Sequence, residues 1–291
     1  MQLGTDQFFE LESLAIKAAK EAGGMIRSKT ASEHQVLQKE GGSSLASQVV
    51  TEVDLESQGM ILEVLEDSLG QFELGLLTEE SPDDSSRLVR DYFWCIDPLD
   101  GTLAFTKGTA GYAVVIALVG RDGVPRIGVV YDPVTDTLYH AVRGQGARKN
   151  GDPWVPGQGE AGAPLTLMID NSFIETAAAP AFRDRLEAVA IAQGCGGYRI
   201  LDHAGAVLNA CQVVDEAPAL YFKFPKPTPG GGSLWDFAAT TCFFNELGLP
   251  VSDVEGNPLR LNPEGSTFMN HCGVLYASDP ALVSSVAALR G

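Results

Sequence analysis

The stretch that decides the fold is Tyr92-Phe93-Trp94-Cys95-Ile96-Asp97-Pro98-Leu99-Asp100-Gly101-Thr102. A run of aromatic and apolar residues is typical of a buried β-strand, and this one leads directly into Asp97. Pro98 has no backbone N–H, so we expect the strand ladder to end there. Asp100 follows closely, and two carboxylates on so tight a turn repel each other unless a cation lies between them. Oxygen ligands of this kind favour a hard divalent ion, above all Mg²⁺.

Three further segments carry acidic residues at the end of an apolar run. They are Val49–Asp54, Leu76–Glu80 and Leu234–Ala239. Taken singly, Asp54, Glu79 or Asp236 is explained by helix capping or solvent exposure, since acidic residues favour caps and turns. Their joint position at strand ends and helix starts is instead typical of α/β active sites. We therefore expect the four acidic segments to meet at one site.

The composition is that of a globular protein with a strong negative charge. Of the 291 residues, 45% are hydrophobic and 20% are charged, so we expect a sizeable core. The formal net charge of −18 should repel nucleic acid and anionic membranes, and we expect neither as a partner. The same charge opposes the arrival of a phosphorylated substrate, so bound metal ions would have to reverse its sign locally.

Cysteine usage and the N-terminal segment indicate a cytoplasmic protein. The five cysteines form no Cys-x-x-Cys pair, and their odd number argues against a complete disulfide framework. Residues 1–6 have neither the basic nor the apolar region of a signal peptide. No apolar run approaches about 18 residues, so we expect no membrane span.

The hydrophobic pattern divides the chain into two halves. We expect residues 1–155 to form an α+β half with a mainly antiparallel sheet that carries most of the metal ligands. Its first predicted helix is capped by Asp6, is weakened at Gly23-Gly24 and runs to about Arg27, and a second helix is entered from Val49-Val50-Thr51. Strands are predicted at 74–77, 92–96, 112–119, 126–131 and 137–142, with a hairpin turn at Arg121-Asp122-Gly123. Loops are predicted over 39–48 and 143–164.

In residues 156–291, strands alternate with helices, which predicts an α/β half that completes a shared active site. Its predicted elements are strands at 165–170, 197–201 and 219–222 and helices at 178–193, 203–212, 234–247 and 279–289.

The acidic segments together resemble one known family. Val50–Asp54, Thr78–Ser81, Ile96–Thr102 and Trp235–Ala239 are similar, in family order, to the motifs of the inositol monophosphatase superfamily. The resemblance covers residues 10 to 276 and includes the central segments Gly128–Pro133 and Ala141–Ala147. It implies an α/β (α+β) fold, a layered α-β-α-β-α sandwich of the sugar-phosphatase type. It also implies a Mg²⁺-dependent phosphomonoesterase, often lithium-sensitive and usually a homodimer.

The resemblance also implies a set of metal ligands. Glu79, Asp97 and the backbone carbonyl of Leu99 would hold the first Mg²⁺. Asp97, Asp100 and Asp236 would hold the second, and Glu79 would help to hold a weaker third ion.

Catalytic and phosphate-binding roles follow from the same resemblance. Gly101 and Thr102 would offer backbone N–H groups to the substrate phosphate at the start of a short helix. Asp54 and Thr102 would form a carboxylate–hydroxyl dyad that orients the attacking water, with Glu79 as a further catalytic residue. Paired metals neutralise a phosphomonoester and activate water, so no nucleophilic serine or cysteine is needed.

The segment Lys223–Ser233, which precedes Trp235, bears on substrate choice. Lys223 and Lys226 either face a second anionic group of the substrate or lie in a surface connection whose proline and glycine residues set its path. Inositol-specific relatives tend to carry an acidic residue in this segment, and here none lies between Glu216 and Asp236. Lys39, in the loop before Asp54, either approaches the phosphate or is solvated.

Several substrates therefore stay open. We place an inositol monophosphate first, because the overall pattern is closest to that branch. Phe105–Gly108 and Tyr112–Val114 also resemble phosphatases of 3′-phosphoadenosine 5′-phosphate and of histidinol phosphate. A non-catalytic protein that binds metal and phosphate is the alternative from a different functional class.

Overall fold

The computed structural model describes residues 2–29, 36–38, 49–170 and 173–290. The larger sheet has seven strands in the order β3-β4-β5-β6-β7-β8-β9, and only β3 and β4 run parallel. The mainly antiparallel sheet expected of the first half is thus confirmed. Its strands are β3 (Gly75–Thr78), β4 (Tyr92–Asp100), β5 (Ala113–Gly120), β6 (Pro125–Asp132), β7 (Thr137–Val142), β8 (Ala147–Lys149) and β9 (Asp152–Pro153).

The smaller sheet has five strands in the order β11-β10-β12-β14-β13. Strand β10 runs parallel to β11 and β12, whereas β14 is antiparallel to both of its neighbours. The strands are β10 (Leu165–Met168), β11 (Tyr198–Leu201), β12 (Ala219–Lys223), β13 (Val251–Ser252) and β14 (Val274–Ala277).

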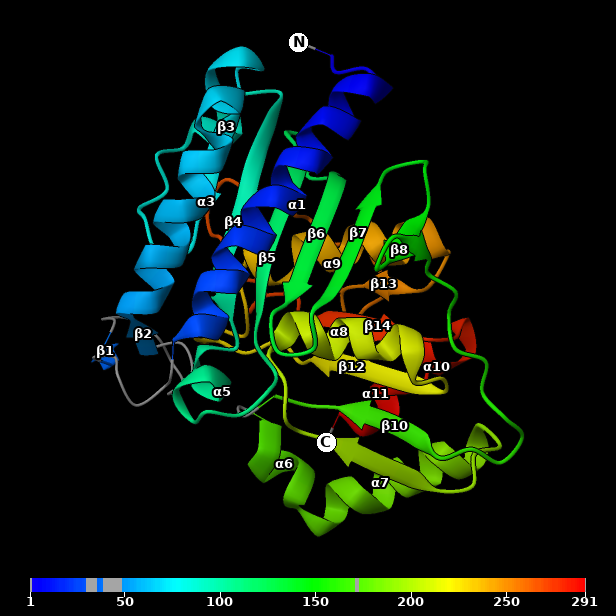
Figure 1. Cartoon of the computed structure of the whole chain (residues 1–291). Coiled ribbons are helices and arrows are strands. Elements are labelled where there is room, and N and C mark those ends of the chain that lie inside the picture. The colour runs from blue at the N-terminus through cyan, green and yellow to red at the C-terminus, as the bar shows by residue number, and fades with distance from the viewer. Residues whose placement is uncertain (1, 30–35, 39–48, 171–172, 291) are drawn as a thin grey trace.

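Helices form the remaining layers (Figure 1). Helices α1 and α3 cover the outer face of the larger sheet, α8 and α9 lie between the two sheets, and the other longer helix, α7, covers the outer face of the smaller one. The helices are α1 (Thr5–Ser28), α3 (Glu52–Gln71), α4 (Ser86–Val89), α5 (Thr102–Thr106), α6 (Ile174–Ala178), α7 (Pro180–Ala192), α8 (Ala206–Asp215), α9 (Leu234–Leu247), α10 (Pro280–Val283) and α11 (Val286–Leu289).

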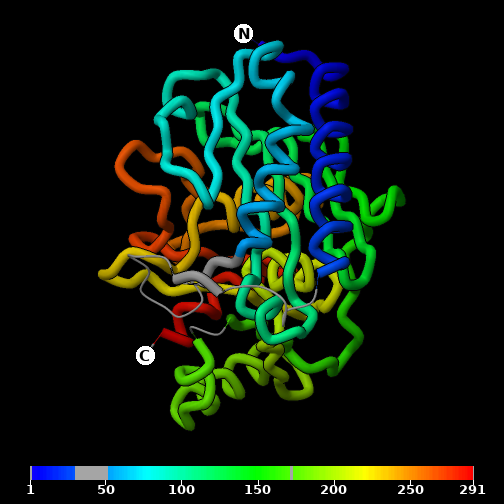
Figure 2. The backbone as a smooth tube through the Cα atoms, turned by 60° about the vertical axis from the view of Figure 1, so that its left-hand side comes forward, coloured from blue at the N-terminus to red at the C-terminus, as the bar shows by residue number. Residues whose placement is uncertain are grey.

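Three buried clusters show that these layers form the expected α-β-α-β-α sandwich. One joins α1 and α3 to the outer face of the larger sheet. A second joins the inner face of that sheet to α8, α9 and the smaller sheet, and a third joins the smaller sheet to α7, α10 and α11. Helix α9 is buried nearly all round, as expected for a helix between two sheets. The tube in Figure 2 shows α1 and α3 side by side on one side of the larger sheet.

Some local expectations were wrong. Gly4, not Asp6, caps α1, and Asp6 lies in its first turn. Val49–Thr51 forms strand β2, which pairs with β1 (Val36–Gln38), so α3 begins only at Glu52.

Other differences are short or interrupted elements. Strands β8 and β9 lie within the predicted loop over 143–164, β13 and β14 were not predicted, and the predicted helix over 279–289 is split into α10 and α11. Helix α1 continues through Gly23, where a Cβ atom would lie 2.4 Å from the Tyr131 ring, so glycine there permits close packing on β6.

No helix in the described part of the chain combines the length and apolar character needed to cross a membrane. The predicted loop over 39–48, with Lys39, lies outside the described residues.

Candidate active site

The alternation of side chains along β4 directs Asp97 toward the middle of the sandwich. Phe93 and Cys95 belong to the cluster shared with α8 and α9, whereas Trp94 and Ile96 belong to the cluster under α1 and α3. Side chains two residues apart on a strand share a face. Asp97 therefore continues the Phe93–Cys95 row and points toward α9.

A β-bulge brings Asp100 to the same face. The ladder does not end at Pro98, as the sequence led us to expect: Asp97 pairs with Val115, and Asp100 pairs with Ala113. Between these pairs, Pro98 and Leu99 of β4 oppose the single residue Val114 of β5, and the extra residue restores Asp100 to the face of Asp97. The Ser57 hydroxyl donates to the Pro98 carbonyl at 2.8 Å, which ties the bulge to α3.

Asp236 reaches the same place from the first turn of α9. One of its oxygens accepts a hydrogen bond from the Ser233 backbone N–H at 2.6 Å, so it caps the helix. Asp97, Asp100 and Asp236 each offer a carboxylate oxygen, and these oxygens lie within 4.8 Å of one another. Asp236 is thus both a cap and a member of this cluster, which we call the carboxylate cluster.

Helix α8 directs its N-terminus at Asp100. The backbone N–H groups of Ala206 and Val207 donate to the two Asp100 oxygens at 3.1 and 3.0 Å. These are N–H groups that a helix start leaves without an intrahelical partner, and the helix dipole favours a negative charge there. Gly205 makes the approach possible, because a Cβ atom at this position would lie 2.3 Å from an Asp100 oxygen.

Burial and the charges of nearby carboxylates raise the pKa of all three carboxyl groups. Burial raises the pKa of Asp97 well above its usual range, and the charges of Glu79, Asp100 and Asp236 raise it further. Burial and the Asp236 charge raise the pKa of Asp100 to about 8. Burial raises the pKa of Asp236 to about 6, although Lys223 opposes the shift. A set of ligands made only of carboxylate oxygens fits a hard divalent cation. Such a cation would relieve the repulsion between the carboxylates, which protonation relieves when no metal is bound.

The other predicted site residues lie around the cluster. Asp54, buried in the first turn of α3, accepts a hydrogen bond from the Thr102 hydroxyl at 3.1 Å, and the Leu99 carbonyl lies at the same distance from that hydroxyl. Gly101 precedes α5 with φ of 84°. Glu79 follows β3, its backbone N–H donates to Ile96, and its charge acts on Asp97 and Asp236.

Lys223 lies beside the cluster but is already paired. Its Nζ atom lies 2.6 Å from Asp170 Oδ2. Lys226 lies further along the same segment, where its Cε atom would be 3.5 Å from a Cβ atom on Gly231. The segment therefore folds back over the glycine run that precedes α9.

Sequence reasoning missed three positioning residues. Gln58 accepts from the Thr78 hydroxyl and the Glu80 N–H and donates to Ser81, so it fastens the Glu79 turn to α3. Its position one turn after Asp54 was the available signal. Gly205 and Asp170 gave no comparable signal, since their roles depend on contacts distant in sequence.

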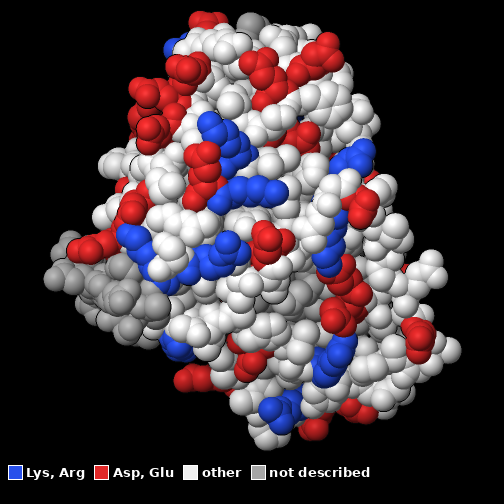
Figure 3. Space-filling model, in the orientation of Figure 1, with Lys and Arg blue, Asp and Glu red and all other residues white. Residues whose placement is uncertain are grey.

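Much of the negative charge lies away from the cluster. In Figure 3 acidic side chains gather at the top of the molecule, where Figure 1 shows the start of α1 and the end of α3. On α3, exposed Glu66 is twelve residues from Asp54, which corresponds to about 18 Å along the helix. Part of the charge that would repel a phosphorylated substrate is therefore remote from the site.

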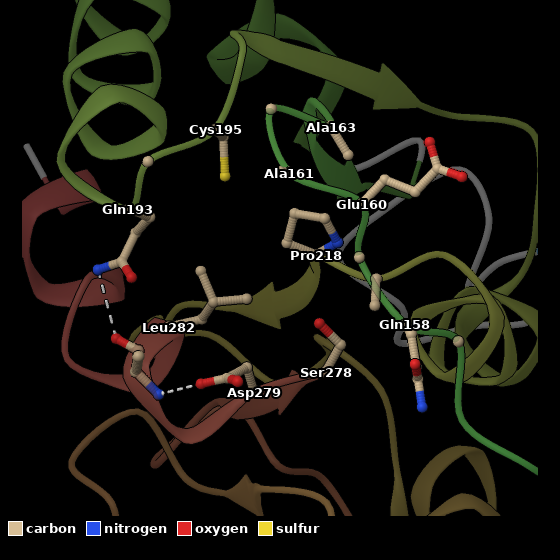
Figure 4. Close-up of a pocket in the computed structure, with 16 residues that line it drawn as sticks. Gln158, Glu160, Ala161, Ala163, Gln193, Cys195, Pro218, Ser278, Asp279 and Leu282 are labelled. Atoms are coloured by element: carbon tan, nitrogen blue, oxygen red, sulfur yellow. Dashed lines mark hydrogen bonds between the residues drawn. The ribbon is translucent and has the colours of Figure 1, made fainter.

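A cavity of about 520 Å³ lies elsewhere, where the loop over 157–163 faces the start of α10 (Figure 4). Cys195, Pro218 and Ser278 are among its lining residues, and it includes none of the predicted site residues.

Comparison with known proteins shows the family to which the chain belongs. The model of the inositol monophosphatase family matches residues 9–290, so the chain belongs to the inositol monophosphatase family, whose members are metal-dependent phosphatases. The chain is 30% identical to the Nus factor SuhB of Pasteurella multocida over 94% of its length and 93% of that protein. It is 25% identical to the inositol-1-monophosphatase of Bacillus subtilis, covering 95% of each chain.

Solved structures show the same fold. A crystal structure titled IMPase/NADP phosphatase complexed with Mg²⁺ and phosphate superimposes with a TM-score of 0.72 at 19% identity, covering 98% of this chain and 97% of that one.

The raised pKa values predict how pH and Mg²⁺ affect stability. A carboxyl group with a higher pKa in the folded state binds protons more tightly there, so its contribution to stability is lost as pH rises through the folded pKa. For Asp236 and Asp100 this loss falls between about pH 4 and about pH 8. We expect Mg²⁺ to raise the melting temperature more at pH 8 than at pH 5.5 in thermal unfolding. An equal rise at both values would contradict proton-linked binding at the cluster.

Gly205→Ala should displace Asp100. The new Cβ atom would force the carboxylate away from the Ala206 and Val207 amides, so we expect at least about a ten-fold loss of Mg²⁺ affinity, measured by calorimetry. Gly59→Ala in α3 is the control, because a Cβ atom there meets nothing within 4 Å. Unchanged affinity in Gly205→Ala would show that this contact does not position Asp100.

Proposed function

We propose that this protein is a Mg²⁺-dependent phosphomonoesterase of a small phosphorylated metabolite, with an inositol monophosphate as its first candidate substrate. The observation that carries the proposal is the carboxylate cluster with the Asp54–Thr102 dyad beside it. The name of the Bacillus subtilis relative supports the choice of substrate.

Each residue of the site has a role in this proposal. Asp97, Asp100, Asp236, Glu79 and the Leu99 carbonyl would hold the metal ions. When bound, Mg²⁺ supplies positive charge that neutralises the phosphate and activates water.

The dyad would orient the attacking water. Because the Thr102 hydroxyl donates to Asp54, its oxygen is left to accept a hydrogen bond from that water. The backbone N–H groups of Gly101 and Thr102 would bind the phosphate.

The two halves of the chain would contribute jointly. Asp97 and Asp100 come from residues 1–155, and Asp236 comes from residues 156–291. Homodimerisation, lithium sensitivity and a cytoplasmic location stay predictions.

A second candidate is a phosphatase of 3′-phosphoadenosine 5′-phosphate. Lys223 and Lys226 favour it, since both lie on the segment that leads to Asp236 and one of them would contact the second phosphate. The Nus factor name of the Pasteurella relative instead favours the non-catalytic alternative.

Phosphate release from a substrate panel tests the proposal. We expect wild-type protein with Mg²⁺ to hydrolyse inositol 1-phosphate in preference to adenosine 3′,5′-bisphosphate and histidinol phosphate. Asp236→Asn keeps an acceptor for the Ser233 backbone N–H but removes a negative charge. We expect it to lower the rate by more than roughly 100-fold, which is the upper range for replacing a residue that only hydrogen-bonds to a metal ligand. Exposed Asp67→Asn in α3 is the control.

Each outcome separates the alternatives. A dominant bisphosphate substrate would favour the second candidate. No phosphate release, with Mg²⁺ binding intact, would favour the non-catalytic alternative, and full activity in Asp236→Asn would refute the metal site.

A further inference from the structure

Lys223 and Asp170 meet because neighbouring parallel strands end side by side. Met168 of β10 is in register with Tyr221 of β12. Two residues further along the chain come Asp170, just past the end of β10, and Lys223, the last residue of β12. A continued alternation of side chains places both on the face of Met168 and Tyr221. That face belongs to the cluster shared with α8 and α9. The carboxyl ends of parallel strands are where α/β sheets bind their ligands.

The pair is largely withdrawn from solvent. The side chains of Lys223 and Asp170 are 15% and 16% exposed, and the ammonium and carboxylate lie 2.6 Å apart. A charge pair in this setting is screened much less than one on the surface.

Lys223 also faces the carboxylate cluster. Its Nζ atom lies 5.8 Å from the centre of the Phe237 ring, and Phe237 directly follows Asp236. Burial acts to lower the pKa of Lys223, but the charges of Asp170, Asp236 and Asp100 outweigh it and the net shift is upward. Lys223 in turn acts on Asp236 more strongly than Asp170 does.

We propose that the Lys223 ammonium, held by Asp170, is a built-in cation of the carboxylate cluster that weakens and thereby sets its affinity for Mg²⁺. The inference rests on the proposed role of the cluster as the Mg²⁺ site. Lys223 and Mg²⁺ repel each other, and both are attracted by Asp236 and Asp100. Asp170 limits this competition, because it draws the ammonium toward β10 and adds a negative charge of its own.

The order of Mg²⁺ affinities follows from these charges. Lys223→Met removes the competing cation and should tighten Mg²⁺ binding at least about five-fold. Asp170→Asn frees the ammonium to turn toward Asp236 and should weaken binding by a similar factor. The double variant removes both charges, so neither is left without its partner. Its Mg²⁺ affinity should lie between those of Lys223→Met and wild type, because Lys223 acts on Asp236 more strongly than Asp170 does.

Calorimetric titration of the metal-free full chain with Mg²⁺, at one pH, measures this order. Circular dichroism and thermal unfolding check each fold, and the double variant keeps the test valid if a single variant fails to fold. Lys149→Met is the matched control, because Lys149 forms a similar pair with Asp215 at 2.7 Å. Asp215 lies at the far end of the ten-residue helix α8 from Asp100, about 15 Å along its axis.

Two results would overturn the proposal. The first is an Mg²⁺ affinity that is unchanged or weaker in both Lys223→Met and the double variant. This result would show that Lys223 does not compete with the metal. If wild-type protein still binds Mg²⁺, the proposed metal site itself would stand. Absence of Mg²⁺ binding in wild-type protein would overturn both this inference and the proposed function.

Discussion

Repulsion among three closely spaced carboxylates, of which Asp97 and Asp100 are buried and Asp236 is half-buried, is the constraint on which the rest of the site depends. Asp97, Asp100 and Asp236 place oxygen atoms within 4.8 Å of one another in a part of the molecule that excludes most water. Buried like charges are costly, so such an arrangement persists only when the surrounding structure imposes it. A divalent cation bound among them would relieve this repulsion, so the repulsion would add to the affinity for the cation.

Separate elements hold each carboxylate in place. The bulge in β4 presents Asp97 and Asp100 on one face, the N-terminus of α8 binds Asp100, and the Ser233 cap fixes Asp236. Helices α8 and α9 lie between the two sheets, and their first turns reach Asp100 and Asp236, so the site forms in the middle layer of the sandwich. The layered fold is therefore what brings residues from both halves of the chain to the carboxylate cluster.

Local apolar patterns were sufficient to predict most of the longer helices and strands. The layered arrangement and the expected roles of the acidic residues followed instead from the resemblance of the acidic motifs to a known family. The sequence predicted strand β7 and helix α9 at their observed bounds. What escaped prediction depends on contacts between distant segments. Pro98 predicted an end to the strand ladder. In the structure the ladder continues through a bulge, which the hydrogen bond from the Ser57 hydroxyl of α3 to the Pro98 carbonyl stabilises. Gly205 and Asp170 act only through Asp100 and Lys223, to which nothing in their local sequence points.

Diffraction from crystals soaked in Mn²⁺ tests the central claim most directly, since Mn²⁺ takes the same oxygen ligands as Mg²⁺ and scatters anomalously. We predict an anomalous peak within bonding distance of oxygen atoms of Asp97, Asp100 and Asp236. No peak there, or a peak only at another acidic position such as Asp279 in the remote cavity, would contradict the account.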